Sequence, residues 1–230
     1  MEAIVLAGGL GTRLREVVPN LPKPMAPICG KPFLEILLSR LAQKGFTRVV
    51  LSVGHLSEII SDHFGDSFAG IRLTYVKEDK PLGTGGAVRL ALSSCTAEHI
   101  YVFNGDTFLD LEVEETEKLW NTFGKPIIVS REVPDTTRYG RILTSGNNIS
   151  AFAEKNQSGH GLINAGCYIF HKSQLNDFPV GEAFSLESDY LQREVGKVEF
   201  VNFTTKGKFI DIGIPTDFNR AQTELSEFTT

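Results

Sequence analysis

The sequence predicts an α/β protein built on a mainly parallel β-sheet, with antiparallel strands added to that sheet in its second half. Up to about residue 130, short apolar runs typical of buried strands alternate with longer stretches that carry apolar residues at helical spacing. Strands separated by helices indicate βαβ units, and such units form parallel sheets. Further on, strand-like runs follow one another and are joined by glycine- and asparagine-rich turns. This second pattern is typical of antiparallel pairs.

The helix predicted for residues 33–44 is the most regular element of the first half. Its leucines share one face, and Gly45 ends it. Ser57 is predicted to be the N-cap of the next helix, because serine is a favoured residue there. The predicted strands of this half cover 3–7, 48–53, 71–76, 100–104 and 127–130, and the predicted helices cover 33–44, 57–64, 84–93 and 113–123.

In the second half, antiparallel strands predicted over 141–144, 149–153 and 163–170 are expected to extend the same sheet. Further strands are predicted over 198–203 and 209–212, and helices over 186–195 and 216–228. We find no proline-rich linker, charge block or short-period repeat. The sequence therefore predicts a single domain over residues 1–230.

Composition and charge exclude several classes of function. The 230 residues are 41% hydrophobic and 22% charged, and the formal charge of −5 argues against nucleic acid or an anionic membrane as a partner. Three cysteines without a C-x-x-C pair predict free thiols in a reducing compartment. The five histidines show no metal-ligand spacing. We expect neither a secretory signal nor a membrane-spanning segment, and hence a cytoplasmic protein.

A glycine-rich stretch follows the first predicted strand, with the sequence Leu6-Ala7-Gly8-Gly9-Leu10-Gly11-Thr12-Arg13-Leu14. Glycine permits positive φ and leaves backbone N–H groups open to an anion. Arg13 and, further on, Lys23 supply the positive charge that phosphate oxygens need. We therefore expect a polyphosphate site and nucleotide chemistry. The alternative is a glycine-rich turn that binds no ligand.

Two common phosphate-binding loops do not fit this stretch. The P-loop pattern fails because no Lys-Ser or Lys-Thr follows the glycines. The dinucleotide pattern G-x-G-x-x-G fails because Leu14 stands where the third glycine belongs. The sequence therefore predicts neither a P-loop ATPase nor a dehydrogenase.

Candidate metal ligands follow two of the predicted strands. Ligands of a parallel sheet bind beyond the carboxyl ends of its strands, which is where Glu78 and Asp106 stand in the sequence. Asp106 follows a buried strand and a glycine, and Asp211 lies within another strand-like run. Mg²⁺ prefers one or two carboxylates together with phosphate oxygens, so this pair predicts a magnesium site. The alternative for each aspartate alone is a turn or a helix cap.

These groups suit attack of a sugar phosphate on a nucleotide. A sugar phosphate is already an anion near neutral pH, so its attack on phosphorus needs positive charge more than a general base. The sequence carries no G-x-S-x-G elbow and no H-E-x-x-H motif. Lys155, next to Glu154 after a strand-like run, is a candidate for the second phosphate, and the alternative there is an ordinary strand end.

Together these motifs resemble those of the sugar-phosphate nucleotidyltransferases, also called nucleoside-diphosphate-sugar pyrophosphorylases. The resemblance extends from residue 3 to about residue 220. It rests on ordered segments, namely the glycine-rich stretch with Pro22-Lys23-Pro24, Leu82-Gly83-Thr84-Gly85-Gly86, Gly105-Asp106, Tyr139-Gly140, Glu154-Lys155, Asn164-Ala165-Gly166 and Asp211-Ile212-Gly213.

The resemblance implies a Rossmann-like fold, Mg²⁺ dependence, and a reaction of a nucleoside triphosphate with a sugar 1-phosphate that yields an NDP-sugar and pyrophosphate. It implies that Arg13 binds the β- and γ-phosphates, that Lys23 lies near the α-phosphate, and that Asp106 and Asp211 hold Mg²⁺. The nucleotide-binding residues that it implies are Leu6, Ala7, Gly8, Gly9, Gly11, Thr12, Gly83 and Thr84. The sugar-phosphate-binding residues that it implies are Tyr139, Gly140, Glu154, Lys155 and Asn164.

Within the family, residues 11–35 are most similar to bacterial D-glycero-α-D-manno-heptose 1-phosphate guanylyltransferases. This similarity implies GTP and heptose 1-phosphate as substrates, in a route to GDP-heptose for surface polysaccharide. Asn156 and Ile214 depart from the residues frequent at these positions, beside the implied sugar and metal contacts. Uridylyl, guanylyl or thymidylyl transfer to a hexose 1-phosphate of the mannose, glucose or N-acetylmuramate type therefore stays an alternative.

Two other classes of protein fit these motifs less well. A catalytically silent nucleotide-sugar sensor would keep the glycines but lose Arg13, Lys23 or a metal aspartate, and all of these are present. A glycosyltransferase is expected to carry an Asp-x-Asp motif, whereas Asp106-Thr107-Phe108 lacks the second carboxylate. The sequence leaves the oligomeric state open, with a homo-oligomer as one alternative.

Overall fold

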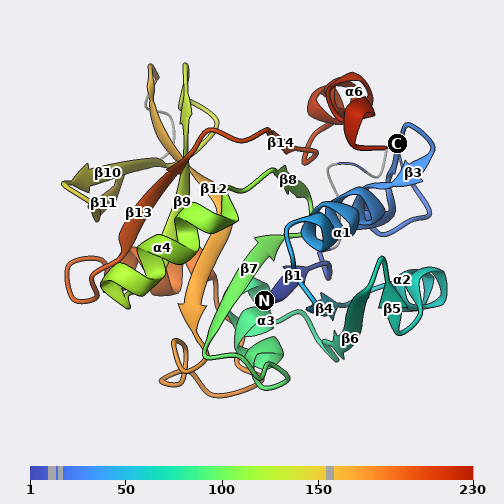
Figure 1. Cartoon of the computed structure of the whole chain (residues 1–230), viewed down its shortest axis with the longest axis horizontal. Helices are drawn as coiled ribbons and strands as arrows, with labels where there is room; N and C mark the ends of the chain where they lie inside the picture. The colour runs from blue at the N-terminus through green and yellow to red at the C-terminus, as the bar shows by residue number, and fades with distance from the viewer. Residues whose placement is uncertain (10–13, 15–17, 154–157, 230) are drawn as a thin grey trace.

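The computed structural model of the chain describes residues 1–9, 14, 18–153 and 158–229 (Figure 1). Within this part of the chain, ten strands form one mixed sheet. In spatial order they are β10 (Arg141–Ser145), β11 (Asn148–Ala153), β13 (Val201–Thr205), β9 (Ile127–Val133), β12 (Gly161–His171), β7 (His99–Asn104), β1 (Glu2–Leu6), β4 (Arg48–Val53), β6 (Ile71–Lys77) and β5 (Ser67–Phe68).

The predicted parallel core of the sheet is confirmed. Strand β1 pairs in parallel with β4 and β7, and β4 pairs in parallel with β6. The predicted antiparallel extension is also present, because β12 lies between β7 and β9 and runs antiparallel to both. Since both neighbours of β12 run opposite to it, β7 and β9 point the same way, and their carboxyl ends lie at the same edge of the sheet.

The helices of the first half match their predicted positions closely. They are α1 (Phe33–Gln43), α2 (Ser57–Phe64), α3 (Gly83–Leu92) and α4 (Val113–Phe123). The prediction that Ser57 caps α2 is wrong. Leu56 precedes the helix with φ 60°, and Ser57 is the first helical residue, so no side chain caps this end. The turn after Gly54 sets the start of α2 instead, since the Ser57 N–H donates to the Gly54 carbonyl oxygen (3.2 Å).

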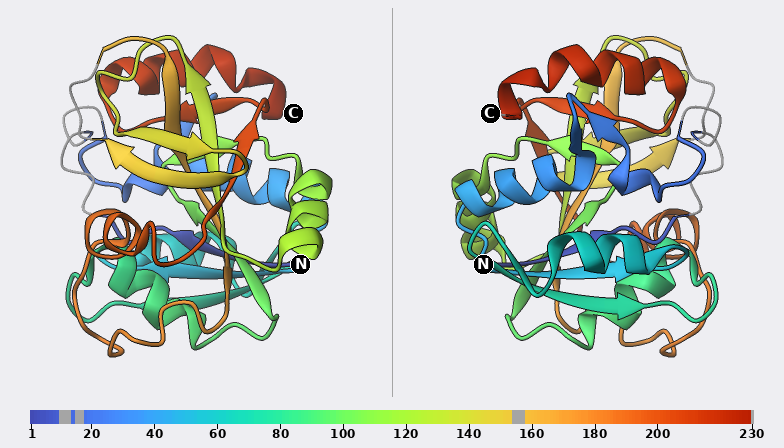
Figure 2. Two further views of the ribbon diagram at one scale, coloured as in Figure 1. Left: turned by 90° about the vertical axis from the view of Figure 1, so that its left-hand side faces the viewer. Right: turned by 90° about the vertical axis from the view of Figure 1, so that its right-hand side faces the viewer.

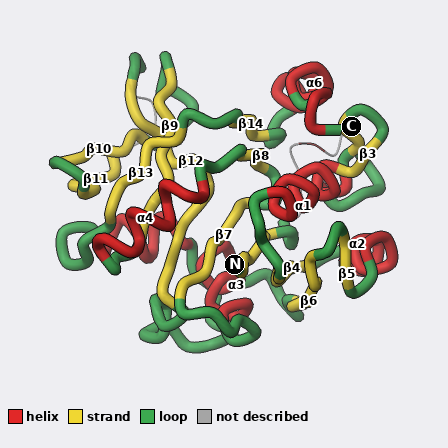
Figure 3. Tube along the Cα trace, in the orientation of Figure 1, coloured by secondary structure: helices red, strands yellow, loops and turns green. Residues whose placement is uncertain are grey.

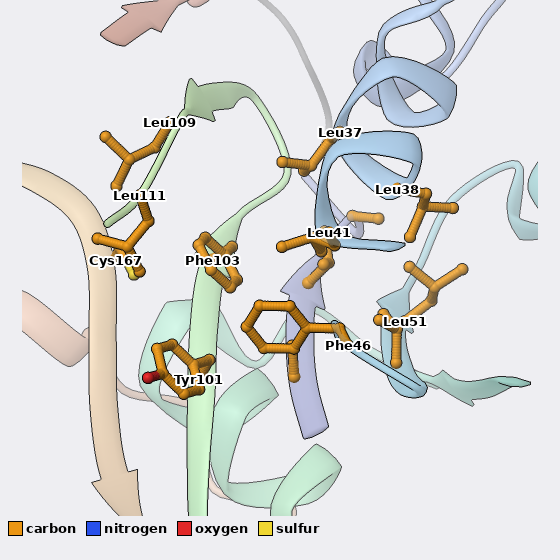
Figure 4. Packing of buried hydrophobic residues seen from close by; sticks show 14 of the residues in the cluster. Leu37, Leu38, Leu41, Phe46, Leu51, Tyr101, Phe103, Leu109, Leu111 and Cys167 are labelled. Atoms are coloured by element: carbon orange, nitrogen blue, oxygen red, sulfur yellow. The ribbon is translucent and has the colours of Figure 1, made fainter. Parts of the chain in front are cut away.

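The sheet is covered on both faces (Figure 2). Helices α1, α2 and α4 pack on one face, and α3 packs on the other together with the residues between β12 and β13. Along β1, Ala3 and Val5 belong to the first cluster and Ile4 to the second, because successive strand residues point to opposite faces. Figure 4 shows the first cluster, in which leucines of α1 meet Phe46, Tyr101 and Phe103. This two-sided burial explains why the first-half strands are nearly continuous apolar runs.

Two short strand pairs stand apart from the main sheet. They are β8 (Thr107–Leu109) with β14 (Phe209–Asp211), and β2 (Pro27–Ile28) with β3 (Lys31–Pro32). The predicted strand over 209–212 therefore exists but joins β8 instead of the main sheet. A third hydrophobic cluster fixes this region, with Leu14, Ile28, Phe108, Ile210 and Phe218 among its buried members.

The second half departs from prediction mainly in its helices. The helix predicted for 186–195 is a π-helix, η3 (Leu186–Leu191), followed by the short α5 (Gln192–Glu194). The helix predicted for 216–228 divides into α6 (Pro215–Glu224) and a 3₁₀ turn, η4 (Ser226–Phe228). Another 3₁₀ turn, η2 (Lys23–Met25), was not predicted. In Figure 3, α6 lies beside the β2–β3 hairpin, and the Gln222 amide donates to the Pro27 carbonyl oxygen (2.9 Å).

Among the helices of the described residues, none is long and apolar enough to cross a membrane.

Candidate functional site

A cavity of about 630 Å³ lies at the carboxyl edge of β1, β4, β6 and β7. Its volume is typical of a site for a small molecule. The predicted nucleotide-binding and catalytic residues that line it are Leu6, Gly8, Gly9, Gly83, Thr84, Lys23 and Asp106. Ala7, which was also predicted to bind nucleotide, lies in the core beneath the cavity and is only 1% exposed.

Gly8 and Gly9 form the floor of the cavity directly after β1. Neither is among the residues with positive φ, so the expectation that these two glycines adopt a positive φ is wrong. Gly8 instead lies against its neighbours. A Cβ at this position would lie 2.7 Å from Glu78 Oε1 and 3.2 Å from the Gly54 backbone nitrogen. Glycine is therefore needed at Gly8 because two loops and a carboxylate approach its backbone closely.

Lys23 and Asp106 form an ion pair in the wall of the cavity. Lys23 Nζ lies 2.5 Å from Asp106 Oδ2, and the exposed fractions of the two side chains are 10% and 35%. Lys23 is held by η2, which follows Pro22, and Asp106 follows β7 and Gly105. A Cβ at Gly105 would overlap the carbonyl oxygen of Leu6, so Asp106 is fixed by tight packing of the chain against β1. The pair presents one positive and one negative group to any ligand in the cavity.

Asp211 is brought to the same place by the β8–β14 pair. Asp211 stands opposite Thr107 in that pair, and the N–H of Ile212 donates to the carbonyl oxygen of Asp106 (2.9 Å). The Asp211 carboxylate accepts the N–H of Gly213 (2.6 Å), which orients it. The two aspartates predicted as metal ligands are therefore neighbours in space, although they are far apart in sequence.

The chemistry of these two side chains fits a hard divalent cation. Carboxylate oxygens are preferred ligands of Mg²⁺, which also takes phosphate oxygens and water. In the described part of the chain, no group of three or more histidine, cysteine, aspartate or glutamate residues gathers as a metal site. Asp106 and Asp211 would thus hold an ion that takes its remaining ligands from the substrates and from water.

Glu78 projects into the cavity and was not predicted as a site residue. It follows β6, its Oε2 accepts the N–H of Leu82 (2.9 Å), and its other oxygen faces Gly8. Burial raises the pKa of Glu78, and the hydrogen bond from Leu82 opposes this shift. The sequence placed Glu78 after a strand, but only the fold shows that its carboxylate points inward. It is therefore a polar group that can fix the orientation of a ligand in an apolar cavity.

The start of α3 is packed against residues 182–186. The carbonyl oxygen of Phe184 accepts the N–H of Gly85 (3.0 Å), and the Thr84 hydroxyl accepts the N–H of Leu186 (2.9 Å). A Cβ at Gly83 would lie 2.6 Å from that same Phe184 oxygen, and Gly83 has φ +68°. The glycines of this turn therefore allow the two segments to meet, while Gly83 and Thr84 still face the cavity.

Of the residues predicted to bind the sugar phosphate, the three that the structure describes, Tyr139, Gly140 and Asn164, are not part of the cavity lining. Tyr139 and Gly140 are in the loop between β9 and β10, and Tyr139 is half-buried. Asn164, on β12, donates to Tyr168 Oη (2.7 Å) and to Glu187 Oε1 (3.0 Å). Its amide oxygen accepts the N–H of Gly166 (3.0 Å). Asn164 therefore positions the Glu187 carboxylate, which sequence reasoning missed.

Comparison with known proteins decides the family. The family model described as nucleotidyl transferase matches residues 2–227. The chain belongs to this family.

Similar members of the nucleotidyl transferase family span nearly the whole chain. It is 40% identical over 229 residues to the D-glycero-alpha-D-manno-heptose 1-phosphate guanylyltransferase of Aneurinibacillus thermoaerophilus, which covers 99% of this chain and 100% of the relative. It is 40% identical over 219 residues to the enzyme of the same name from Campylobacter jejuni, covering 95% and 97%. A crystal structure of HddC from Yersinia pseudotuberculosis complexed with GMP-PN matches with a TM-score of 0.85 and 36% identity, covering 97% and 99%.

These matches confirm the predicted family and the predicted fold of this nucleotidyl transferase. Five residues predicted for its site lie outside the residues that the structure describes, namely Gly11, Thr12, Arg13, Glu154 and Lys155. In the described part, Lys23, Asp106 and Asp211 come together next to a cavity lined by the predicted glycines. Such a set, together with a divalent cation between the carboxylates, suits the negative charge of a phosphate group.

Proposed function

We propose that the chain transfers a guanylyl group from GTP to D-glycero-α-D-manno-heptose 1-phosphate, giving GDP-heptose and pyrophosphate for surface polysaccharide. The observation that carries the proposal is the 40% identity over 99% of the chain to a heptose 1-phosphate guanylyltransferase. The similarity to an HddC structure complexed with GMP-PN supports a guanine nucleotide as the bound substrate. The proposed enzyme is a single domain over residues 1–230, and its three free cysteines suit the cytoplasm.

In this reaction the protein mainly binds the two substrates, aligns their phosphate groups and neutralises their negative charge. The sugar 1-phosphate oxygen is already charged and attacks the α-phosphorus, so Lys23 and Arg13 would cancel repulsion between the two anions. Lys23 lies in the wall of the cavity and Arg13 follows its floor in the sequence. Leu6, Gly8, Gly9, Gly83 and Thr84 would enclose the nucleotide in the cavity. The sugar-phosphate residues, from Tyr139 to Lys155 and Asn164, would hold the second substrate beyond Asp211.

We also propose that the divalent cation is Mg²⁺, held by Asp106 and Asp211. When bound there, it would stabilise negative charge that develops on the phosphate oxygens. The two carboxylates support this choice because Mg²⁺ binds through one or two carboxylates together with substrate phosphates.

Glu78 provides a physical reason for guanine. The Watson–Crick edge of guanine carries two adjacent donors, N1–H and the N2 amino group, and one carboxylate can accept both. Uracil and thymine offer one such N–H between two carbonyl groups, while adenine and cytosine place an acceptor beside their amino group. The two oxygens of Glu78 accept the Leu82 N–H (2.9 Å) and, more weakly, the Ser52 hydroxyl (3.5 Å). Each carboxylate oxygen has a second lone-pair site, so this half-buried group can still accept two donors of a base in the cavity, which favours guanine.

Replacing Glu78 by glutamine should weaken discrimination for GTP. The Glu78→Gln variant keeps one acceptor but turns an N–H donor toward a guanine donor, so we expect kcat/KM for GTP to fall by about 100-fold. The ratio of UTP to GTP turnover should rise, because an amide can pair with the carbonyl and N–H of uracil. Steady-state pyrophosphate release with each nucleotide measures both effects.

Glu58→Gln is the matched control for this prediction. Glu58 also lines the cavity, but its side chain is 66% exposed and pairs with Lys77 (2.6 Å). An exposed ion pair of this kind contributes little free energy, so the preference of the Glu58→Gln variant for GTP should be unchanged. Equal losses of GTP preference in the two variants would contradict the role of Glu78.

The proposed substrates are tested by measuring pyrophosphate release with GTP, UTP, CTP and dTTP against a panel of sugar 1-phosphates in Mg²⁺. We expect the highest kcat/KM with GTP and D-glycero-α-D-manno-heptose 1-phosphate. Highest turnover with GTP and mannose 1-phosphate would show that the sugar substrate is mannose 1-phosphate instead of the heptose 1-phosphate. A preference for UTP or dTTP with a glucose-type phosphate would reject the guanylyl assignment.

A further inference from the structure

Arg138 lies beside the metal-site aspartate and was not among the predicted site residues. It stands in the loop between β9 and β10, directly before Tyr139. Its Nη2 donates to Asp217 Oδ2 (2.7 Å), and its side chain is 50% exposed. Asp217 belongs to the first turn of α6 and its side chain is 6% exposed, so the guanidinium is anchored at one end by a buried carboxylate.

The guanidinium of Arg138 is held in place, but the described residues do not use all of its hydrogen-bond donors. Its central carbon lies 5.5 Å from the centroid of the Tyr139 ring, which limits its motion from a second side. Among the described residues, Asp217 is the hydrogen-bond partner that the structure gives to Arg138, and a guanidinium carries five N–H donors. Donors of a half-exposed, fixed guanidinium therefore face solvent, in the planar arrangement that matches two oxygens of a phosphate.

The ion pair with Asp217 brings the Arg138 loop to the segment that follows Asp211. Asp211 ends β14, and α6, which carries Asp217 in its first turn, begins four residues later at Pro215. The contact between Arg138 and Asp217 therefore fixes the Tyr139 loop near the carboxyl end of β14. The hydrogen bond to Asp217 raises the pKa of Arg138, and the charge of Asp211 adds to that effect.

This loop lies on the side of Asp106 that faces away from the nucleotide cavity. The cavity is lined by residues from Leu6 to Asp106, on the side of β7 where β1, β4 and β6 lie. Strand β9, which leads into the Arg138 loop, lies on the other side of β7, beyond β12 (Figure 1). Because β9 and β7 point the same way, the loop reaches the same edge of the sheet as Asp106. A second anionic substrate that meets the nucleotide at the aspartates has to approach from this side.

We propose that Arg138 binds the phosphate group of the sugar 1-phosphate, and that Asp217 is the residue that positions its guanidinium. The inference rests on the proposed function and deepens it, since it adds a specific binding group for the second substrate. A phosphate placed next to Asp211 meets like charge and needs a fixed cation there. Arginine meets this need at every pH of interest, because its guanidinium stays protonated.

The chain offers a matched control in Arg220. Its Nη1 donates to the other oxygen of Asp217 (2.9 Å), and its side chain is 52% exposed, much like that of Arg138. Its Nε, however, pairs with Glu224 (2.6 Å) along α6, away from the Tyr139 loop. Replacing either arginine by methionine removes one partner of the same buried carboxylate, but only Arg138 faces the proposed phosphate.

The test compares the Arg138→Met, Arg138→Lys and Arg220→Met variants with the wild type by steady-state pyrophosphate release. We expect Arg138→Met to raise the KM for the sugar 1-phosphate by about tenfold or more, with the KM for GTP within about twofold of the wild type. Arg138→Lys should recover part of the loss, because it keeps the charge without the planar pair of donors. Arg220→Met should leave both KM values within about twofold, since it removes only the ion pairs that Arg220 makes with Asp217 and Glu224 on α6.

Two results would overturn the inference. Equal increases in sugar 1-phosphate KM in Arg138→Met and Arg220→Met would show that the arginines only hold the loop to α6. An unchanged sugar 1-phosphate KM in a folded Arg138→Met variant would remove Arg138 from the site. If the methionine variant does not fold, an unchanged KM in Arg138→Lys would remove it in the same way. Failure of the proposed function is distinguishable, because it would appear in the wild type itself, as preferred turnover of another nucleotide or sugar 1-phosphate or as no turnover, whereas the role of Arg138 is judged by the difference between variant and wild type.

Discussion

Replacing Asp106 by asparagine is expected to lower kcat by about 1000-fold, as loss of a charge-stabilising group at a phosphoryl-transfer centre does. Asparagine keeps the shape of the side chain but removes the negative charge that holds a divalent cation and pairs with Lys23 (2.5 Å). The rate of pyrophosphate release at saturating GTP and heptose 1-phosphate measures the effect. Titration with Mg²⁺ should show a raised requirement for the ion.

Asp110→Asn is the control for this change, since it removes a carboxylate from the same segment. Asp110 pairs with Arg40 (2.7 Å) and with Lys44 (2.8 Å), and these cations hold the pKa of its carboxyl below the usual range in spite of burial. We expect Asp110→Asn to lower the free energy of unfolding by about 1–2 kcal/mol while kcat stays close to that of the wild type. Comparable kcat values in Asp106→Asn and in the wild type would remove Asp106 from the mechanism.

Replacing Lys23 by methionine is expected to lower kcat/KM for GTP by about 100-fold or more. The Lys23 side chain is only 10% exposed, so its charge acts in a poorly hydrated wall of the cavity, where electrostatic interactions are strong. Methionine fills a similar volume without the charge. Steady-state kinetics with varied GTP and fixed sugar 1-phosphate measures the loss.

Arginine should not rescue this position. A guanidinium is larger and planar and cannot reproduce the single short contact of the lysine ammonium with Asp106 Oδ2, so Lys23→Arg should also be impaired. Lys44→Met provides the control, because Lys44 is 26% exposed and pairs with Asp110 outside the cavity lining. A Lys23→Met enzyme as active as Lys44→Met would show that charge at this wall is dispensable.

The alternation of strands and helices could be predicted from the sequence because burial on both sides of a parallel sheet leaves a strong local pattern. Helix α4 begins and ends at the predicted residues, and β4 does as well. The N-cap of α2 could not be predicted, because Leu56 takes a left-handed conformation that depends on the packing of its turn. Strand β8 has three residues, which is too short for a periodic signal, and its pairing with the predicted strand β14 could not be predicted either.

The order of strands depends on contacts that no local pattern records. The antiparallel insertion of β12 between β7 and β9 is a property of the folded sheet, and it separates the nucleotide side from the Tyr139 loop. The same limit applies to Glu78 and Arg138. Each is an ordinary charged residue in the sequence, and its importance follows from its neighbours in the fold. Glu78 faces Gly8, and Arg138 binds Asp217.

The resemblance to a family placed Asp106 and Asp211 correctly beside each other, but the physical reason lies in the short β8–β14 pair. Likewise, glycine at Gly8 was predicted from a backbone conformation that it does not adopt. Its absence of a side chain is needed for close approach instead. A motif that is defined by spacing alone can name a residue without giving the physical reason why that residue is needed.

Delivery of Asp211 by β14 makes the proposed ion site depend on a segment outside the main sheet. The ten strands of the main sheet end in sequence at Thr205, before β14 and α6. The third hydrophobic cluster holds this last segment through Ile210 and Phe218. Local opening of the segment would therefore withdraw one of the two proposed carboxylates while the main sheet stays folded.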